Sequence, residues 1–567
     1  MKASLFLGIV IFMTGLIYWL NPGGIFFKTS GNYKRANKPI NDFMELRPDK
    51  ALINGINVPV PQESQLILYN NKFGYLTPGG SGRFELRVES NRIIGISVGQ
   101  TEIPSGGFVL SGGGEAGDFL KKNTGMGLNV TLSGMTVQIR ENPQTIYAKL
   151  STNINYANEL YSQVSGNHEY QWNKAASFLQ KANQYFNEVK QSAGQASIEN
   201  DKYYELLQEA SDSLQKANLN LIRTPDKEVR GVIYRLSSRD PKVIQSFLDT
   251  MVARKYNTLF IDTWYHGYTL YPSKMADQNP MFRGMDPLEI IVKEAHKRGL
   301  RVICWSESLY IGRSEPEIKR KHNDWIGRNR QGGFLSIRDY KSQFLCPSND
   351  SVRHYLVEIS REMARKYPID GIVLDFLRYP DEMNVEEGLC YDSSCRAKFN
   401  AQYHYDPILI KKSDDKKVVQ WRKFREEQVT KLVSDTYHAL KKDNPRFPVG
   451  AFVFPGTNTL GQNWQDWLNK DLLDYYAVMV LSQNKSDMEN SINGFKKYTQ
   501  PRKKGLIVGM YIAPYLSEVE IGDKFQIQRD SLIDGLFVPS DRLLNEDKQQ
   551  FYDESIFWKK ALIPEGY

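Results

Sequence analysis

The stretch from residue 228 to 540 most constrains the fold, because short apolar runs alternate there with amphipathic helical patterns. The clearest helix is predicted at residues 286–299, where apolar residues recur every three or four positions. Eight β/α units over about 310 residues are what a (β/α)8 barrel, the TIM-barrel class of α/β fold, requires. Near-continuous apolar strands are typical of a parallel sheet that is covered on both faces. The predicted strands are 229–236, 256–263, 300–306, 369–376, 448–454, 475–482, 505–512 and 534–540.

Two other patterns precede the predicted barrel. From residue 50 to 141, short alternating runs punctuated by Gly and Pro predict a small β-rich accessory domain. From 143 to 223, apolar residues step by three and four positions in three successive seams, which predicts a helical bundle or coiled-coil segment. We expect this segment to serve as a spacer or to contact a protein partner.

The N-terminus carries an apolar run without charge, residues 3–20. Its length fits a membrane span or a long signal-peptide core. It ends in Tyr18, Trp19 and Leu20 without a small-residue cleavage site, which favours an uncleaved transmembrane anchor. We therefore expect residues 1–22 to be a signal anchor or signal peptide, followed by a linker at 23–49. The rest of the chain would then be extracytoplasmic, membrane-anchored or secreted if the segment is cleaved.

Charge and cysteine content narrow the functional classes. The net charge of +8 is small for 567 residues, and no basic helix or aromatic-interleaved basic run is present, which argues against nucleic acid as a partner. Cys390 and Cys395 are close enough for a loop disulfide, as an exported protein permits. A zinc site would need His404 and a further ligand in a spacing that matches no standard module, so we expect no metal and no cofactor. Cys304 lies in an apolar strand and is expected in the core.

Acidic and aromatic residues stand at the ends of the predicted strands. In a (β/α)8 barrel these C-terminal ends meet at one mouth. Asp375 ends the fourth strand, with Arg378 three residues on to keep it ionised. Splitting a glycosidic bond needs one carboxylic acid and one carboxylate across the sugar, and aromatic faces can stack on sugar rings. The other acids near strand ends are Asp262, Glu307 and Asp466.

Each of these residues also has a structural explanation. Asp375 could cap the next segment or pair with Arg378, and Asp466 could be the N-cap of the helix that carries Trp467. His266 and His296 are more often packed or surface histidines than ligands.

Residues 228–540 resemble the glycosyl-hydrolase-like 10 family of bacterial envelope proteins. The matching stretches include YNTLFIDTWYHGYTLYPS, FLCPSNDSVRHYLVEI, IDGIVLDFLRYP, GLCYDSSCRAKF and WQDWLNKDLLDYYAVM. The resemblance implies a barrel domain at 228–562 that hydrolyses glycosidic bonds in an envelope polysaccharide, with peptidoglycan glycan strands as a substrate class. It also implies Asp375 as nucleophile or transition-state stabiliser and Glu307 or Asp466 as general acid. The substrate-binding residues would be Asp262, Trp264, Trp305, Arg378, Tyr379 and Trp467.

The chain departs from the family pattern at three places. Many relatives end strand three in His-Ala-Trp, where this chain has Ile303, Cys304 and Trp305, and a Tyr near strand six is replaced by Leu481. Strand two often ends in Glu where Asp262 stands. The loss of a His and a Tyr leaves open an alternative, a non-catalytic glycan-binding scaffold of the envelope. Transglycosylation or lytic cleavage by the same cleft is a third hypothesis.

Overall fold

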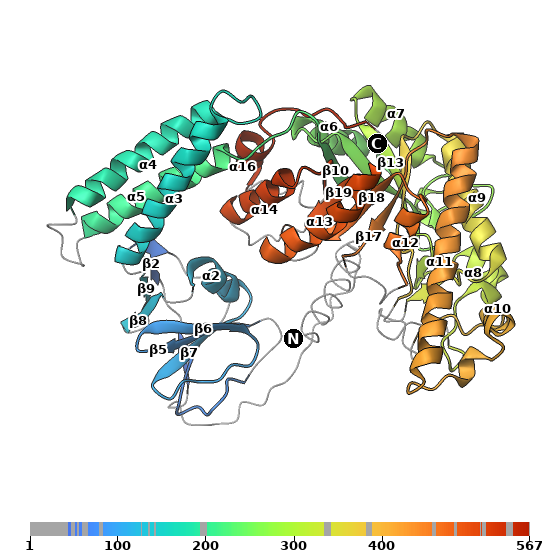
Figure 1. Cartoon of the computed structure of the whole chain (residues 1–567), viewed down its shortest axis with the longest axis horizontal. Helices are drawn as coiled ribbons and strands as arrows, with labels where there is room; N and C mark the ends of the chain where they lie inside the picture. The colour runs from blue at the N-terminus through green and yellow to red at the C-terminus, as the bar shows by residue number, and fades with distance from the viewer. Residues whose placement is uncertain are drawn as a thin grey trace. The chain divides into compact units, whose positions relative to one another are not determined.

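The computed structural model in Figure 1 describes most of the chain, in two compact units. The described residues of one unit fall within 223–512 and 523–567, and those of the other within 43–222 and 518–522. The predicted signal or anchor segment at 1–22 lies outside the described residues. In the described part, no helix is long and apolar enough to cross a membrane. The described ranges are 43–46, 51–53, 56–58, 66–78, 83–125, 128–133, 136–140, 143–192, 201–333, 342–380, 388–455, 461–480, 485–510, 512, 518–539, 548–565 and 567.

Eight parallel strands form a closed barrel, as the sequence predicts. The order is β10-β20-β19-β18-β17-β16-β13-β11, and β10 pairs with β11 to close the ring. A two-residue strand, β12 (Tyr268–Thr269), adds to β11 in antiparallel direction. All eight predicted strands are present, with ends that differ by at most two residues. They are β10 (Val229–Tyr234), β11 (Thr258–Tyr265), β13 (Arg301–Ser306), β16 (Gly371–Leu374), β17 (Val449–Val453), β18 (Tyr475–Val480), β19 (Gly505–Met510) and β20 (Gly535–Pro539).

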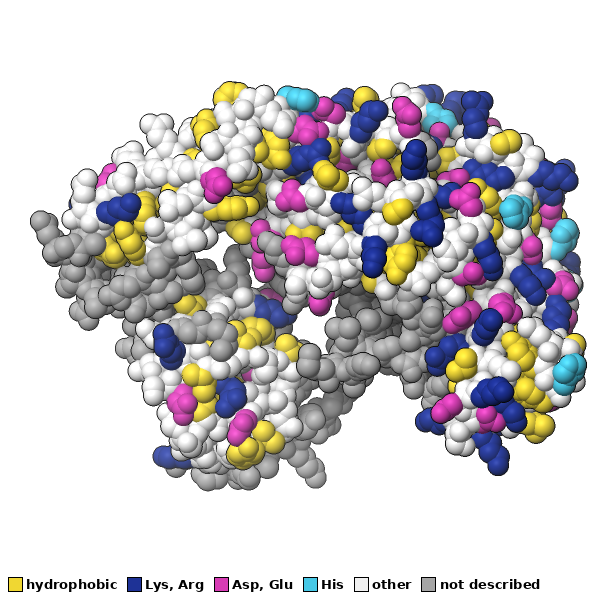
Figure 2. All heavy atoms as spheres, in the orientation of Figure 1, with side chains coloured by type: hydrophobic (Ala, Val, Ile, Leu, Met, Phe, Trp, Pro, Cys, Tyr) yellow, Lys and Arg dark blue, Asp and Glu magenta, His cyan; other side chains and the backbone are white. Residues whose placement is uncertain are grey.

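Helices cover the outer face of the barrel (Figure 1). Several begin with a side chain that caps the first backbone N–H groups, as Asp286 does for α7 and Asn349 for α9. Helices α9 and α11 lie side by side and are linked by the ion pair between Arg361 and Asp443. Figure 2 shows basic and acidic side chains interspersed over this face. The longer helices are α6 (Pro241–Ala253), α7 (Pro287–Lys297), α9 (Asp350–Lys366), α10 (Ser393–Tyr403), α11 (Asp415–Asp443), α13 (Lys485–Thr499) and α14 (Glu518–Asp530).

The inside of the barrel is a packed core that alternates glycine with aromatic side chains. A Cβ on Gly450 would collide with the ring of Tyr475 on the neighbouring strand, and one on Gly509 with the ring of Phe537. The missing side chains leave the space that these rings fill, so the interior is solid and not a pore. Buried inward residues are Val229, Ile233, Phe260, Ile303, Trp305, Val373, Phe452, Tyr475, Ala477, Ile507 and Phe537.

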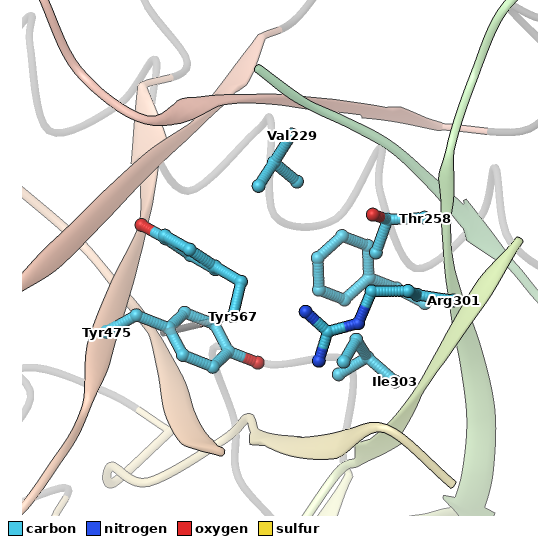
Figure 3. A pocket seen from close by; sticks show the side chains of 7 residues that line it. Val229, Thr258, Arg301, Ile303, Tyr475 and Tyr567 are labelled. Carbon is cyan, nitrogen blue, oxygen red and sulfur yellow. The ribbon is translucent and has the colours of Figure 1, made fainter. Parts of the chain in front are cut away.

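The N-terminal end of the barrel is closed by the end of the chain. Tyr567 donates its hydroxyl to Oδ2 of Asp534 over 3.0 Å, and its ring lies 5.2 Å from that of Tyr475. Figure 3 shows Tyr567 beside a small void whose other walls come from the first residues of several strands, Thr258 and Arg301 among them. This void lies at the end of the barrel opposite to the acidic strand ends.

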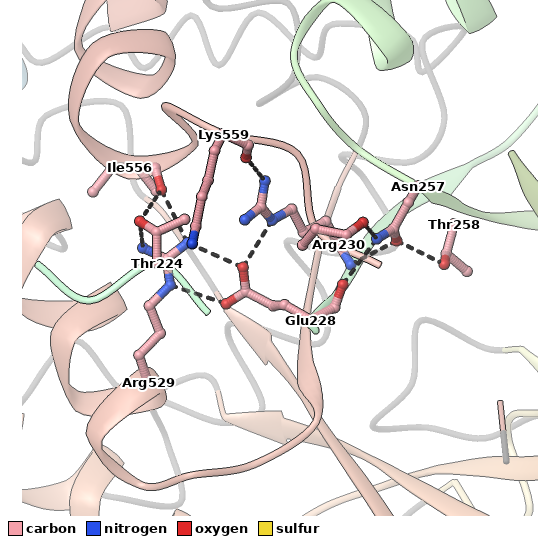
Figure 4. A network of polar contacts seen from close by, with 9 residues as sticks. Thr224, Glu228, Arg230, Asn257, Thr258, Arg529, Ile556 and Lys559 are labelled. Carbon is pink, nitrogen blue, oxygen red and sulfur yellow. Dashed lines mark hydrogen bonds and ion pairs between the residues drawn. The ribbon is translucent and has the colours of Figure 1, made fainter. Parts of the chain in front are cut away.

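A buried carboxylate joins the first strand to the C-terminal part of the chain. Glu228 accepts from Arg230 (2.8 Å) and from Nε and Nη2 of Arg529 (2.9 and 3.0 Å) (Figure 4). Burial alone would raise the pKa of Glu228, but the two guanidinium groups outweigh it and lower that pKa. Arg230 also donates to the carbonyl of Lys559. The network is structural, since it lies at the start of β10 and not at its end.

The other unit holds a sheet, the short helix α2 (Glu115–Asn123) and a group of three longer helices. The nine strands run in the order β1-β4-β7-β5-β6-β8-β9-β2-β3, and all pairs are antiparallel except β2 with β9. Strand β1 (Phe43–Leu46) belongs to the sheet, so the predicted linker at 23–49 overlaps it. The remaining strands are β2 (Ala51–Ile53), β3 (Ile56–Val58), β4 (Leu66–Asn70), β5 (Phe84–Glu89), β6 (Arg92–Val98), β7 (Gly107–Gly112), β8 (Asn129–Ser133) and β9 (Thr136–Arg140).

The helical pattern of residues 143–223 is confirmed. Helices α3 (Pro143–Val164), α4 (Trp172–Ser192) and α5 (Asp201–Asn220) bury the predicted seams against one another, with Leu150 and Phe186 in the shared core. Whether the sheet and the helices are separate domains with the predicted boundaries stays a prediction.

Candidate active site

The centre of the candidate site is Arg235, which follows the first barrel strand. Its Nε donates to Asp262 Oδ2 and its Nη2 to Glu307 Oε1, each over 2.7 Å. The guanidinium also lies over the ring of Tyr265, 3.6 Å from its centroid. Three successive strands of the barrel, β10, β11 and β13, therefore bring a cation and two acids together at their C-terminal ends.

Asp375 is the third carboxyl of this site. It follows β16, and its backbone N–H donates to the carbonyl of Ser306 on β13 over 2.7 Å. Its Oδ2 accepts from the indole N–H of Trp305 over 3.0 Å, and its Oδ1 accepts from the backbone N–H of Phe376 over 2.6 Å. Phe376 has a φ of 49°, a left-handed conformation that costs energy for a bulky residue and that turns the chain sharply after the strand. The strand end thus fixes the orientation of the Asp375 carboxyl.

The three carboxyls differ in exposure. Asp262 and Glu307 are only 3% and 2% exposed, whereas Asp375 is partly exposed. A ligand at the mouth would therefore meet Asp375 before the other two. One oxygen of Asp262, Oδ1, is buried without a hydrogen-bond partner within the described part of the chain.

Burial raises the pKa of all three acids. The pKa of Asp375 is raised to about 6 by burial, against the lowering effect of the Phe376 N–H, Arg378 and Trp305. Burial, aided by the charge of Asp375, raises the pKa of Asp262 to about 7, although Arg235 opposes this. The pKa of Glu307 is raised well above its usual value by burial and by the two neighbouring acids, again against Arg235. The raised pKa values of Asp262 and Glu307 let this cluster retain a proton near neutral pH, as a general acid requires.

Arg378 lies beside this cluster as a buried cation. Its side chain is 1% exposed, and its guanidinium lies 4.8 Å from the centroid of the Phe376 ring and 5.9 Å from that of Phe454. Nη1 donates to the carbonyl of Tyr379, but Nε and Nη2 have no hydrogen-bond partner in the described residues. Its charge lowers the pKa of Asp375, as the sequence suggests.

His266 follows Tyr265 and stacks on it with ring centroids 3.7 Å apart. Burial, together with the charge of Arg235, lowers its pKa to about 3. The imidazole is therefore neutral at physiological pH. It is a packed histidine, as expected, and its backbone N–H points to Oε2 of Glu307 at 3.4 Å.

Four of the predicted site residues lie away from the cluster. Trp264 is fully buried, packs edge-on against Tyr355 and donates to the carbonyl of Ser308, so its ring is not open to a sugar. Trp467 is also fully buried and donates to the hydroxyl of Thr430. Both rings pack against protein groups, so their burial does not support the prediction that they bind substrate.

Tyr379 and Asp466 likewise face other partners. The hydroxyl of Tyr379 points to Cys390 Sγ at 3.5 Å, away from the acids. Asp466 pairs with Lys470 on its own helix, α12 (Trp464–Asn469), over 2.6 Å and contacts none of the three carboxyls. The N-cap of this helix is Asn463, not Asp466. The structure therefore favours Glu307 over Asp466 as the acid.

Trp305 and Asp262 belong to the cluster, but the indole N–H and one carboxylate oxygen bond to other protein side chains. The Trp305 indole is 3% exposed and binds Asp375, while Asp262 binds Arg235, so both position other side chains. The sequence analysis did not identify Arg235 as a site residue. The sequence does place this Arg directly after the apolar residues of the first strand, as it places Asp375 after those of the fourth. Leu481, which stands where many relatives have a tyrosine, lies outside the described residues.

The cysteines confirm two predictions and form one group that the sequence did not indicate. Cys390 and Cys395 form a disulfide, and Cys304 is buried in β13, both as the sequence indicates. The expectation that no metal is bound stays a prediction, but the structure brings together a group of possible ligands that the sequence did not indicate. Cys346 and Asp392 join the pair, and the four ligand atoms lie within 4.8 Å of one another. Sequence spacing hid this group because Cys346 is remote in the chain and an aspartate replaces the expected histidine.

Several known proteins are similar to this chain. Glycosyl hydrolase DigH of Escherichia coli K12 is 23% identical over 321 residues, which are 51% of this chain and 68% of that protein. Glycosyl hydrolase YngK of Bacillus subtilis is 23% identical over 248 residues, 39% of this chain and 43% of that protein. An α-L-fucosidase isoenzyme 2 from Paenibacillus thiaminolyticus matches with a TM-score of 0.42 at 15% identity, covering 58% of this chain and 48% of its own. The model of the glycosyl hydrolase-like 10 family matches residues 228–530, more than half of the chain, and the protein belongs to that family.

Proposed function

We propose that this protein is a glycoside hydrolase that acts on a polysaccharide of the cell envelope, with peptidoglycan glycan strands as the first substrate to test. The observation that carries the proposal is the cluster of Arg235, Asp262, Glu307 and Asp375 at the C-terminal ends of four adjacent strands. Membership of a glycosyl hydrolase-like family supports it. The extracytoplasmic location and the N-terminal membrane anchor remain part of the proposal.

The two catalytic roles follow from exposure and charge. Asp375 is the most accessible acid and has the lowest pKa of the three, so it is the carboxylate that stabilises or attacks the cationic sugar. Glu307 keeps its proton by burial and beside like charges, and it is the general acid for the leaving oxygen. Arg235 holds Glu307 and Asp262 in place, and Arg378 keeps Asp375 ionised.

The test is digestion of isolated glycan strands, with and without stem peptides, by the purified full-length chain. We expect soluble fragments from the wild type, and none above background from Asp375→Asn or Glu307→Gln. Asp466→Asn is the matched control, because its carboxylate pairs only with Lys470, and it should retain activity. Mass spectrometry of the ends distinguishes hydrolysis, which leaves a reducing end, from transglycosylation or lytic cleavage. Unchanged activity in Asp375→Asn would refute the assigned role.

One observation favours the alternative of a non-catalytic glycan-binding scaffold. Both buried acids are held by Arg235, and the indole of Trp305 is bound to Asp375, so most polar groups of the cluster already have protein partners. A scaffold would bind glycan strands without releasing fragments, and Asp375→Asn would leave that binding unchanged. A contact with a protein partner through α3, α4 and α5 is a further proposal, for which pull-down of the helical segment is the test.

A further inference from the structure

A second group of chemically active side chains lies apart from the three acids. Cys346 follows the short strand β15 (Gln343–Phe344), Cys390 and Asp392 precede α10, and Cys395 lies in its first turn. All four are buried, and their ligand atoms lie within 4.8 Å of one another. Besides the disulfide between Cys390 and Cys395, the sulfur of Cys346 lies 3.3 Å from that of Cys390. A third sulfur therefore packs directly against a bonded pair.

One carboxylate oxygen in this group has no N–H or O–H donor among the described residues. Asp392 is 5% exposed, and its Oδ1 caps α10 by accepting from the backbone N–H of Cys395 over 3.1 Å. Its Oδ2 is buried without such a donor in the described part of the chain, and the Cys346 side chain is the further group that hydrogen-bonds to this carboxyl. A thiol is a weak donor, so a buried carboxylate beside it is a suitable ligand for a cation.

The surroundings favour thiolates over thiols once a cation is present. The backbone N–H groups of Ser348 and Asn349 bond to the Cys346 side chain and favour its charged form. Cys395 lies at the N-terminus of α10, where the helix dipole stabilises a negative sulfur.

The donor set and its dimensions suit zinc. Zinc takes four thiolate, imidazole or carboxylate ligands in a tetrahedron, with Zn–S near 2.3 Å and Zn–O near 2.0–2.2 Å, so neighbouring ligand atoms lie about 3.4–3.8 Å apart. Four ligand atoms within 4.8 Å of one another reach this geometry with small side-chain movements. The positive charge of the nearby Arg328 offsets part of the negative charge of three thiolates and one carboxylate.

We propose that Cys346, Cys390, Asp392 and Cys395 bind one zinc ion when the Cys390–Cys395 disulfide is reduced. A dithiol reductant supplies two electrons and two protons, so that the disulfide becomes two thiols and the reductant becomes a disulfide. Zinc then displaces the three thiol protons to the buffer. The ion joins the segment after β15 to the segment before α10, and the hydroxyl of Tyr379 links Cys390 to the residues that follow Asp375.

The experiment uses the full-length chain, reduced with dithiothreitol, incubated with zinc chloride and freed of excess metal by gel filtration without oxygen. We expect one zinc per chain by mass spectrometry of the metal, and four reactive thiols after denaturation in a chelator. Cys346→Ala should retain less than a tenth of the zinc. Cys304→Ala is the matched control, since it removes another buried cysteine that lies in β13, and it should keep one zinc.

A second measurement does not depend on variants that fold. Cobalt(II) added to the reduced wild type should give the thiolate charge-transfer and intense visible bands of a tetrahedral site, and zinc should abolish them. Fully reduced protein with four thiols that carries no more zinc than Cys346→Ala, and that shows no such bands, would overturn the proposal. The disulfide would then be the only chemistry of this group.

Discussion

Trp305 donates its indole N–H to Oδ2 of Asp375 over 3.0 Å, so a side chain of the third strand orients the carboxylate that ends the fourth. Because the hydrogen bond favours the charged carboxylate, it also lowers the pKa of Asp375. Trp305 therefore contributes to the orientation and ionisation of the most accessible acid, beside the Phe376 N–H and Arg378, without needing to touch a sugar.

The first prediction concerns pH. If Asp375 must be ionised and Glu307 protonated, glycan hydrolysis should follow a bell-shaped profile whose acidic limb reflects the Asp375 pKa of about 6. Replacing Trp305 by Phe removes a hydrogen bond to the carboxylate, which raises this pKa and moves the acidic limb to higher pH. The measurement is kcat/KM against pH for both proteins. A limb that does not move would show that Trp305 leaves the ionisation of Asp375 untouched.

The second prediction concerns the general acid. Glu307→Gln keeps the shape of the side chain and one acceptor for Arg235 but removes the proton donor. The rate of hydrolysis should fall by about 100-fold or more, since general acid catalysis typically contributes 10²–10⁴. A glycoside with a good leaving group, which needs no proton, should lose much less. Equal losses on both substrates would instead indicate a structural role.

The third prediction concerns Arg235. Removing it, as in Arg235→Gln, leaves Asp262 and Glu307 buried without their cation, at a cost of roughly 3–5 kcal/mol in the free energy of unfolding. The cost should shrink at acidic pH, because the burial-raised pKa values let both acids become neutral there. Urea unfolding at about pH 8 and about pH 5 measures the difference. Lys470→Gln, which breaks an exposed pair with Asp466, is the control and should change stability by about 0.5 kcal/mol or less.

The fourth prediction concerns Glu228 and acid stability. The pKa of Glu228 is lowered in the folded chain by Arg529 and Arg230, although burial opposes them. A lowered folded pKa means that the stabilisation is present above the unfolded value of about 4.3 and is lost as pH falls through the folded value. Glu228→Gln should therefore destabilise the barrel at neutral pH and flatten its loss of stability in acid. Thermal unfolding from neutral to acidic pH tests this, and parallel curves for both proteins would contradict it.

The fifth prediction uses a pair of glycines. Ala at position 450 would force its methyl group into the ring of the buried Tyr475, so Gly450→Ala should cost about 1–3 kcal/mol. Gly494 lies in helix α13 with open space around it, and Ala there should stabilise by roughly 0.5–1 kcal/mol because it lowers the entropy of the unfolded chain. Chemical unfolding of both variants should thus give changes of opposite sign.

The local pattern of apolar and polar residues was enough to predict the architecture. The eight apolar strands show burial of both faces, and the helical seams and the alternating β-rich segment show burial of one face. The position of Asp375 at a strand end followed from the same pattern, since the C-terminal ends of barrel strands share one mouth.

Partners across strands could not be read from the sequence. Arg235 binds acids that are 27 and 72 residues away, and Cys346 meets Cys390 across 44 residues. Trp264 lies near a strand end like the site residues and Trp467 lies in α12, but both rings are fully buried. The sequence by itself determined which elements form and where the acids stand along them. Only the tertiary structure decided which side chains meet, because contacts between distant segments depend on barrel register and on the direction of each side chain.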